Sequence, residues 1–181
     1  MTQEPPAPRD PLVITLAGLP QSEYGDGYRE HSVQIYKTYL EMADRISERR
    51  EKANSFFLAV NTALTALLAK DALGTGAPAA LAVLAPLAGG ILCYLWHRII
   101  RSYRDLNSAK FKVVHAIERQ LPLRPYDAEW EAVGRGNNPR LYLPFTHVEL
   151  LVPWIFMVFY VLFAGSAIPW VSLVEKVRGA G

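Results

Sequence analysis

The chain has 181 residues, a net charge of +2 and a single cysteine, Cys93. The near-neutral charge argues against a dedicated nucleic-acid binder, which would carry a basic face, and one cysteine excludes a disulfide framework or a thiolate metal site. Hydrophobic residues make up 51% of the chain, only slightly above a soluble average, but they are concentrated in three blocks. This distribution predicts a membrane protein with a cytosolic part.

Residues 1–27 predict a flexible cytosolic N-terminal segment. The first ten residues contain three prolines and no periodicity, as is typical of a disordered tail. Residues 12–16 could form a short extended segment, and glycines and prolines keep the chain irregular until about residue 26. The apolar run here is too short for a signal peptide, so we expect internal segments to direct membrane insertion.

A continuous helix is predicted from about residue 28 to 70. Tyr36, Leu40, Ala43 and Ile46 recur at helical spacing, which predicts a buried stripe on an amphipathic helix. No helix breaker separates this part from the apolar stretch at 53–70. At ~1.5 Å per residue that stretch can cross a bilayer with some local thinning, so we expect the first transmembrane span there.

The second long helix repeats this design in reverse. An apolar span at 77–96 continues as an amphipathic helix to Leu121, where Pro122 gives a natural stop. The short bridge between the spans makes the two helices antiparallel neighbours, and residues 28–121 are expected to form one long helical hairpin. Pro86 and the pair Gly89 and Gly90 should bend the second helix or allow a close helix approach.

Residues 122–147 predict a small, turn-rich cytosolic segment. Asp127 is placed to cap a short helix, and we expect Trp130 on that helix to pack against the hairpin. Residues 148–171 supply a third transmembrane helix with Pro153 in its first turn, and 172–181 form an external tail.

The predicted fold is therefore an all-α membrane protein with three transmembrane helices, the first two continuing into the cytosol as a long antiparallel helical hairpin, plus the turn-rich segment. Orientation follows from the bases, which gather before the first span, after the second and before the third. By the positive-inside rule the N-terminus is cytosolic and the C-terminus external.

No pattern for catalysis, a cofactor or a metal is recognisable. The four histidines are scattered, with no pair at metal-ligand spacing: His31, His97, His115 and His147. A phosphate-cradling glycine motif and a nucleophile elbow are also absent. We therefore expect a protein that is not an enzyme and binds no cofactor.

Polar residues inside the predicted membrane region are the first candidate site. Asn61, with Thr62 and Thr65 in the same helix, could line a pore or form hydrogen bonds between helices. An ion-coupled transporter would normally need an ionisable residue there, whereas the only strongly polar residues inside the predicted membrane region are Asn54 and Asn61. Hydrogen bonding between helices is the favoured interpretation.

Basic residues at the cytosolic interface are the second candidate site. Each can gain roughly 1 kcal/mol from anionic lipid, and a ring of bases around an anion-selective pore entrance is the alternative. The six candidates for contact with lipid headgroups are Arg49, Arg50, Lys52, Arg98, Arg101 and Arg104.

Two stretches carry a resemblance to a known family. DRISERREKANSFF at 44–57 and WHRIIRSYRDLNSAKFKVVHAIERQLPLRPYDAEW at 96–130 resemble the bacterial small integral membrane proteins grouped with RipA as octameric membrane proteins. The likeness covers about 28–165. It implies a homo-oligomer, an octamer, in a bacterial cytoplasmic (inner) membrane, and it brings no catalytic residues. The arrangement also resembles the SLATT membrane effectors, although the third span and the missing sensor domain depart from that pattern.

The leading functional hypothesis is a non-enzymatic, homo-oligomeric inner-membrane protein that acts as a scaffold or channel-like assembly. Its expected partners are membrane lipids and further copies of the chain, and no nucleic acid. The alternative is a membrane-permeabilising effector of a bacterial defence or stress system. A lipid-modifying enzyme would need converging histidines or carboxylates at the interface, which the sequence does not indicate.

Overall fold

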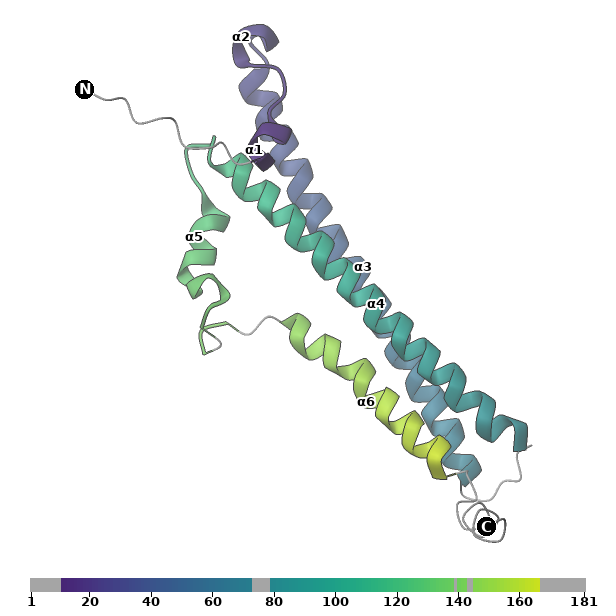
Figure 1. The fold of residues 1–181 in the computed structure, drawn as a ribbon. Coiled ribbons are helices and arrows are strands. Elements are labelled where there is room, and N and C mark those ends of the chain that lie inside the picture. Colours follow the sequence, from purple (N-terminus) through teal and green to yellow (C-terminus); the bar gives the residue numbers. More distant parts are fainter. Residues whose placement is uncertain (1–10, 73–78, 139, 143–144, 167–181) are drawn as a thin grey trace, which may run out of the picture. The chain divides into compact units, whose positions relative to one another are not determined.

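The computed structural model describes residues 11–72, 79–138, 140–142 and 145–166, and all regular secondary structure in them is helical (Figure 1). This confirms the predicted all-α class. The first ten residues, the bridge between the first two predicted spans and the external tail fall outside the described residues.

The longest helix is α3, Tyr28–Ala72, where the sequence predicts one helix from about 28 to 70. Its continuity follows from composition, because no proline or glycine occurs between its ends and either residue would weaken a helix interior. The predicted stripe is inward-facing: Tyr36 and Leu40 are half-buried, and Ala43 and Ile46 are buried.

Two short helices precede α3: α1, Pro11–Leu16, and α2, Gln21–Tyr24. The prediction of an extended or irregular chain there was wrong. Proline suits the first turn of a helix because its φ is already set, and Pro11 occupies that place in α1. In α2 the Pro20 carbonyl accepts the amides of Glu23 and Tyr24 at 3.0 Å, and Gly25, at φ +88°, ends the turn.

The second long helix is α4, Ala79–Glu118, with Pro86 inside it. It ends slightly before the predicted Leu121, whose amide bonds to the Glu118 carbonyl in a tight turn. The sequence predicts an apolar stripe at Tyr103, Leu106, Val113, Ile117 and Leu121, but Leu106 is 49% exposed and the other four are only half-buried. The fully buried positions are instead Val114 and Glu118. A carboxylate therefore occupies a core position on this helix.

Three further elements complete the described chain: α5, Pro125–Ala132, the 3-10 turn η1, Gly134–Gly136, and α6, Phe145–Ser166. Asp127 lies inside the first turn of α5 and is not its cap; Arg124 precedes the helix and makes no side-chain cap bond. Pro153 is well inside α6, so its predicted first-turn position was wrong because the helix begins before the apolar run.

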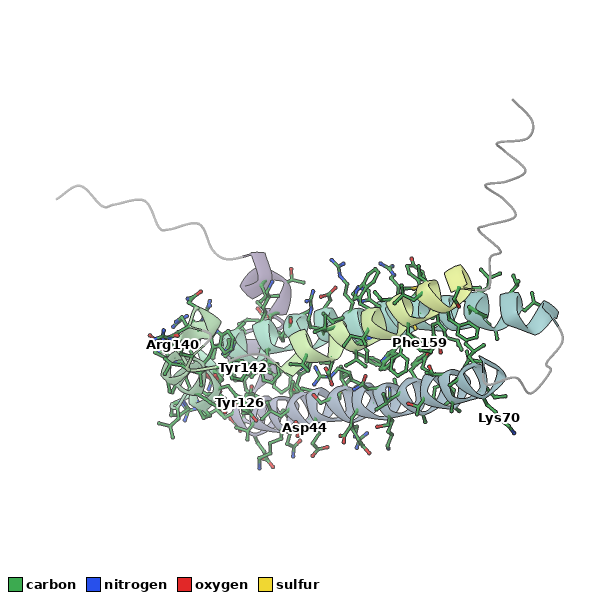
Figure 2. All side chains as sticks on the ribbon, turned by 90° about the horizontal axis from the view of Figure 1, so that it is seen from below. Asp44, Lys70, Tyr126, Arg140, Tyr142 and Phe159 are labelled. Carbon is green, nitrogen blue, oxygen red and sulfur yellow. The ribbon has the colours of Figure 1, made fainter. Side chains whose placement is uncertain are left out.

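The chain divides into two compact units: a first unit of Met1–Glu48 and Arg104–Leu143, and a second unit of Arg49–Tyr103 and Pro144–Gly181. Within each unit the segments of α3 and α4 run antiparallel. The core of the second unit has two clusters, one around Tyr160 and Leu68 and the other around Trp96. Phe159 of α6, labelled in Figure 2, packs against the first of these.

Two described segments are long and apolar enough to cross a membrane: Val83–Glu118 in α4 and Val148–Ser166 in α6. Only 33% and 17% of their apolar windows are buried, whereas the core helix of a soluble protein would be mostly covered. The second half of α3 is not among them, and its polar residues Asn54, Asn61 and Thr65 lower its hydropathy. The described residues therefore show two of the three predicted spans as candidates.

Candidate functional site

A buried asparagine joins three helices in the second unit. Asn61 of α3 is fully buried, and its Nδ2 donates to the Phe57 carbonyl one turn earlier at 2.8 Å. Its Oδ1 accepts the Tyr160 hydroxyl of α6 at 3.0 Å and the Cys93 thiol of α4 at 3.3 Å. Because each side-chain polar atom has a partner, Asn61 acts within this unit as a hydrogen-bonding centre between helices.

The two threonines near Asn61 lie differently. Thr62 is exposed, and Thr65 is half-buried one turn further along α3. The Thr65 hydroxyl oxygen is itself buried, so Thr65 lies on the same inward face as Asn61, whereas Thr62 points to the surface. Of the three candidate polar residues, Asn61 is the one that is fully buried.

A second contact between α3 and α4 lies about two turns from Asn61. The Trp96 indole is fully buried, and its Nε1 donates to Asn54 Oδ1 at 2.9 Å. The same ring stacks on Phe57, with centroids 6.0 Å apart, and meets Phe156 of α6 at 6.1 Å. An indole with an apolar face and a satisfied N–H is well suited to this position.

Gly89 allows α4 and α6 to approach closely. A Cβ at Gly89 would lie 2.4 Å from Cζ of Tyr160, which no real side chain tolerates. Small residues permit such helix approaches in membranes. Gly89 thereby gives the Tyr160 ring the space it needs to reach Asn61.

An ion pair links α3 to α6 in the second unit. Arg50 Nε lies 3.5 Å from Glu149 Oε2, and the Glu149 side chain is 5% exposed. Arg50, predicted to contact lipid headgroups, is thus engaged within the chain. Glu149 was missed by sequence reasoning because it is a single acid at the edge of an apolar block.

The other predicted headgroup residues lie at the surface to different degrees. Arg104 is half-buried and donates from Nε and Nη2 to the Asp105 carboxylate at 3.1 and 3.0 Å. The remaining four, Arg49, Lys52, Arg98 and Arg101, are exposed.

A buried carboxylate organises the first unit. Glu118 of α4 is fully buried, and its Oε1 accepts the Tyr36 hydroxyl of α3 at 2.9 Å. Its two oxygens also accept the backbone amides of Tyr126 and Asp127, each at 3.1 Å, in the first turn of α5. Carboxylates are favoured at helix N-termini, so Glu118 caps α5 from a different helix.

Two neighbours add to this site. His115 Nδ1 lies 3.6 Å from Glu118 Oε2, and the Tyr126 ring packs on Phe111 of α4 with centroids 5.8 Å apart. Tyr126, labelled in Figure 2, therefore provides the aromatic contact to α4. Trp130, expected in that role, instead meets Tyr142 within its own segment at 6.2 Å.

Sequence reasoning also missed Glu118. Its one available signal is that it follows Val114 by one turn, which puts an acid on the inward face of an amphipathic helix. Burial of a carboxylate requires hydrogen-bond donors. The three donors to Glu118 come from α3 and α5, so the sequence of α4 around Glu118 does not reveal them.

The Glu118 site changes the ionisation of the Tyr36 phenol. Burial, together with the hydrogen bond to Glu118, raises the pKa of the Tyr36 phenol well above its ordinary value. The folded state therefore holds this proton more tightly than the unfolded state. We expect the free energy of unfolding to fall as the pH rises above about 10, the ordinary tyrosine pKa.

The measurement is denaturant unfolding of the detergent-solubilised protein between pH 8 and about 11. Tyr36→Phe should show a shallower loss, since it removes the phenol that titrates. Equal slopes for the two proteins would contradict this assignment.

The Asn61 site makes a second prediction. Asn61→Leu and Tyr160→Phe each remove one partner of the same hydrogen bond, so a double-mutant cycle should give a coupling of about 0.5–1.5 kcal/mol, the range for such bonds in membranes. Thr62→Val, at an exposed position, is the matched control and should show no coupling with Tyr160→Phe. Additive effects of the first pair would show that the bond does not contribute.

No group of histidine, cysteine and carboxylate side chains in the described part of the chain could hold a metal ion. An open groove of about 400 Å³ in the first unit is lined by uncharged side chains and one histidine: Tyr24, His31, Gln34, Ile35, Thr38 and Tyr39. His31 Nδ1 in it lies 2.8 Å from the Tyr24 hydroxyl. The groove contains no carboxylate to act with this histidine.

Comparison with known protein families shows what this chain is similar to. Residues 33–169 match the octameric membrane protein family, which is well over half of the chain. No curated protein and no solved structure matches. The match includes α4 and α6, which hold both candidate spans, and the sites around Asn61 and Glu118. The chain therefore belongs to the octameric membrane protein family.

Proposed function

We propose that this chain is a non-enzymatic subunit of an octameric inner-membrane assembly that serves as a scaffold or channel-like body. Family membership supports a membrane location and an octamer. The observation that carries the proposal further is that the second unit has a polar residue in its interior and apolar side chains on its surface. Asn61 is enclosed and hydrogen-bonded, while apolar side chains of α4 and α6 such as Leu84, Ile91 and Val161 are more than half exposed.

This distribution fits a subunit that is closed inside and apolar outside. Apolar surface of this extent is covered by lipid or by other subunits in a membrane protein. A polar path through a single subunit would need polar groups facing an open space, and Asn61 faces Tyr160 and Cys93 instead. Any conducting path therefore runs between copies and not through one chain.

The proposed topology has three spans. The second half of α3 supplies the first, because residues 53–69 carry no charge and Phe56 and Leu67 of this stretch are about 60% exposed. The α3 and α4 helices form one long hairpin that continues into the cytosol. The bases place the N-terminus and the 122–147 segment in the cytosol and the C-terminus outside.

Native mass spectrometry of the detergent-solubilised protein tests the assembly, and the expected mass is eight chains. A monomer at micromolar concentration would refute it. Reconstitution into liposomes then separates the two roles, since a channel-like body raises ion flux and a scaffold leaves it unchanged. Cysteine labelling from outside the cell at residue 176, but not at residue 9, is the expected result for the topology.

A further inference from the structure

The two long helices carry opposite charges on faces that their own chain leaves open. On α3, the exposed acids Glu41, Asp44 and Glu51 follow one another at spacings of three and seven residues, which places them on one helix face. Glu48 lies on the same face between them but already has an interaction within the chain. The result is an acidic stripe, defined here as Glu41, Asp44 and Glu51.

The exposed face of α4 carries a basic stripe of Arg98, Arg101 and Lys112, again at spacings that share one helix face. Asp105 lies within this stripe, but its carboxylate accepts two hydrogen bonds from Arg104. That pairing offsets its charge, so the face remains basic.

Within one chain the two stripes do not meet. In the second unit, α3 and α4 meet where Trp96 bonds to Asn54 and where Cys93 bonds to Asn61. In the first unit, Lys110 lies over the Tyr39 ring at 4.3 Å. These contacts are on the inner faces of the helices. Both stripes are exposed, as Asp44, labelled in Figure 2, illustrates for α3.

The inner contacts fix which residues lie at the same level along the antiparallel pair. In the second unit, Asn54 opposite Trp96 places Glu51 level with Arg98 and Arg101. In the first unit, Tyr39 opposite Lys110 and Tyr36 opposite Glu118 place Glu41 level with the turn that contains Lys112. Acid and base thus match in level in each unit separately.

We propose that the acidic stripe of α3 binds the basic stripe of α4 in the next copy of the chain. In a closed ring of identical subunits every contact is head-to-tail, so one face meets a different face of its neighbour, and equivalent residues share a level along the ring axis. Glu41 then pairs with Lys112 of the neighbouring copy, and Glu51 with its Arg98 and Arg101. The inference rests on the proposed octameric assembly and identifies its subunit interface.

The competing intrahelical pairs do not prevent this. Glu41 and Arg45, four residues apart on α3, can pair on the surface, but exposed pairs of this kind are weak. Complementary charges between subunits mainly set orientation and exclude wrong partners, which is what a ring of identical chains requires.

Cysteine cross-linking in native membranes tests the proposed pairing. Cys93→Ser gives a background without other cysteines and keeps a donor to Asn61. Two chains carry matched pairs, Glu41→Cys with Lys112→Cys and Glu51→Cys with Arg98→Cys. Two control chains carry the same residues in mismatched pairs, Glu41→Cys with Arg98→Cys and Glu51→Cys with Lys112→Cys.

The matched pairs should form disulfides on oxidation and give a ladder of bands up to the octamer. The mismatched pairs should give about tenfold less product or none, because ten residues of α3 span ~15 Å and a disulfide requires Cα atoms within ~7 Å. Equal cross-linking of matched and mismatched pairs overturns the inference. A product that stops at the dimer overturns it too, since a head-to-tail contact has no such limit.

Charge reversal provides an independent measurement. Glu51→Arg and Arg98→Glu should each reduce the octamer fraction in native mass spectrometry, and the double variant should restore it. The inference is wrong if Arg98 contacts lipid and not the neighbouring subunit. In that case Arg98→Glu weakens binding to vesicles that contain anionic lipid, and adding Glu51→Arg does not restore the octamer. A wild-type protein that is monomeric would refute the proposed assembly itself, whereas an intact octamer without rescue refutes only this interface.

Discussion

Glu118→Ala should lower the free energy of unfolding of the first unit more than any other single substitution on the helices of that unit. The change leaves the Tyr36 hydroxyl and the amides of Tyr126 and Asp127 without their acceptor, and each unpaired buried donor costs about 1–3 kcal/mol. Partial access of water to the α5 end reduces the sum, so we expect a loss of about 3–5 kcal/mol in the free energy of unfolding.

Denaturant unfolding of the solubilised protein measures this loss, with hydrogen exchange of the α5 amides as a local readout. Tyr36→Phe removes one of the three bonds and should cost about 1 kcal/mol. Glu129→Ala, an exposed acid on α5, is the matched control and should change little. If Glu118→Ala were no more destabilising than Glu129→Ala, the carboxylate would have no structural role.

Gly89→Leu should separate α6 from α4 in the second unit. Even the first side-chain atom would lie 2.4 Å from the Tyr160 ring, and the ring has little room to move because its hydroxyl is bonded to Asn61. Overpacking typically costs about 1–3 kcal/mol, which exceeds the gain of up to about 1 kcal/mol from replacing a helical glycine.

The loss is measurable as reduced resistance to unfolding in detergent and as new protease sensitivity of α6. Gly90→Ala is the matched control, because a Cβ there would meet only the Met157 sulfur at 3.5 Å, an ordinary contact. Tyr160→Leu in the Gly89→Leu background should recover part of the loss by making room. If Gly89→Leu behaved like Gly90→Ala, the close approach would not exist.

Helix positions in this chain are largely predictable from local chemistry. α3 could be predicted from the absence of breakers between residues 28 and 72, and the Gly89 pair was correctly associated with a close helix approach. Asn61 stood out because a lone amide in an apolar stretch needs a partner. Each of these inferences needs only the neighbouring residues in the sequence and the apolar surroundings that they imply.

Partners distant in sequence could not be predicted in the same way. The residues around Glu118 give no indication that the Tyr36 hydroxyl bonds to it. Those around Arg50 likewise do not indicate its ion pair with Glu149. Hydrophobicity alone predicts an anchoring role for Trp130, whereas Tyr126 makes that contact because it lies in the first turn of α5, which Glu118 caps. The prolines and glycines before residue 28 predict an irregular chain and not the short helices α1 and α2, because proline breaks a helix in its interior but suits its first turn.

The position of Glu118 also has a consequence for the order in which the first unit folds. The carboxylate lies only 8 and 9 residues from the amides it accepts in α5, but 82 residues from the Tyr36 hydroxyl. Short loops close at a lower entropic cost than long ones, so the corner between α4 and α5 can form as soon as both are synthesised. The Tyr36 hydroxyl then bonds to Glu118 when α3 packs against α4. The Glu118 side chain thus stabilises first the corner between α4 and α5 and afterwards the contact between α3 and α4.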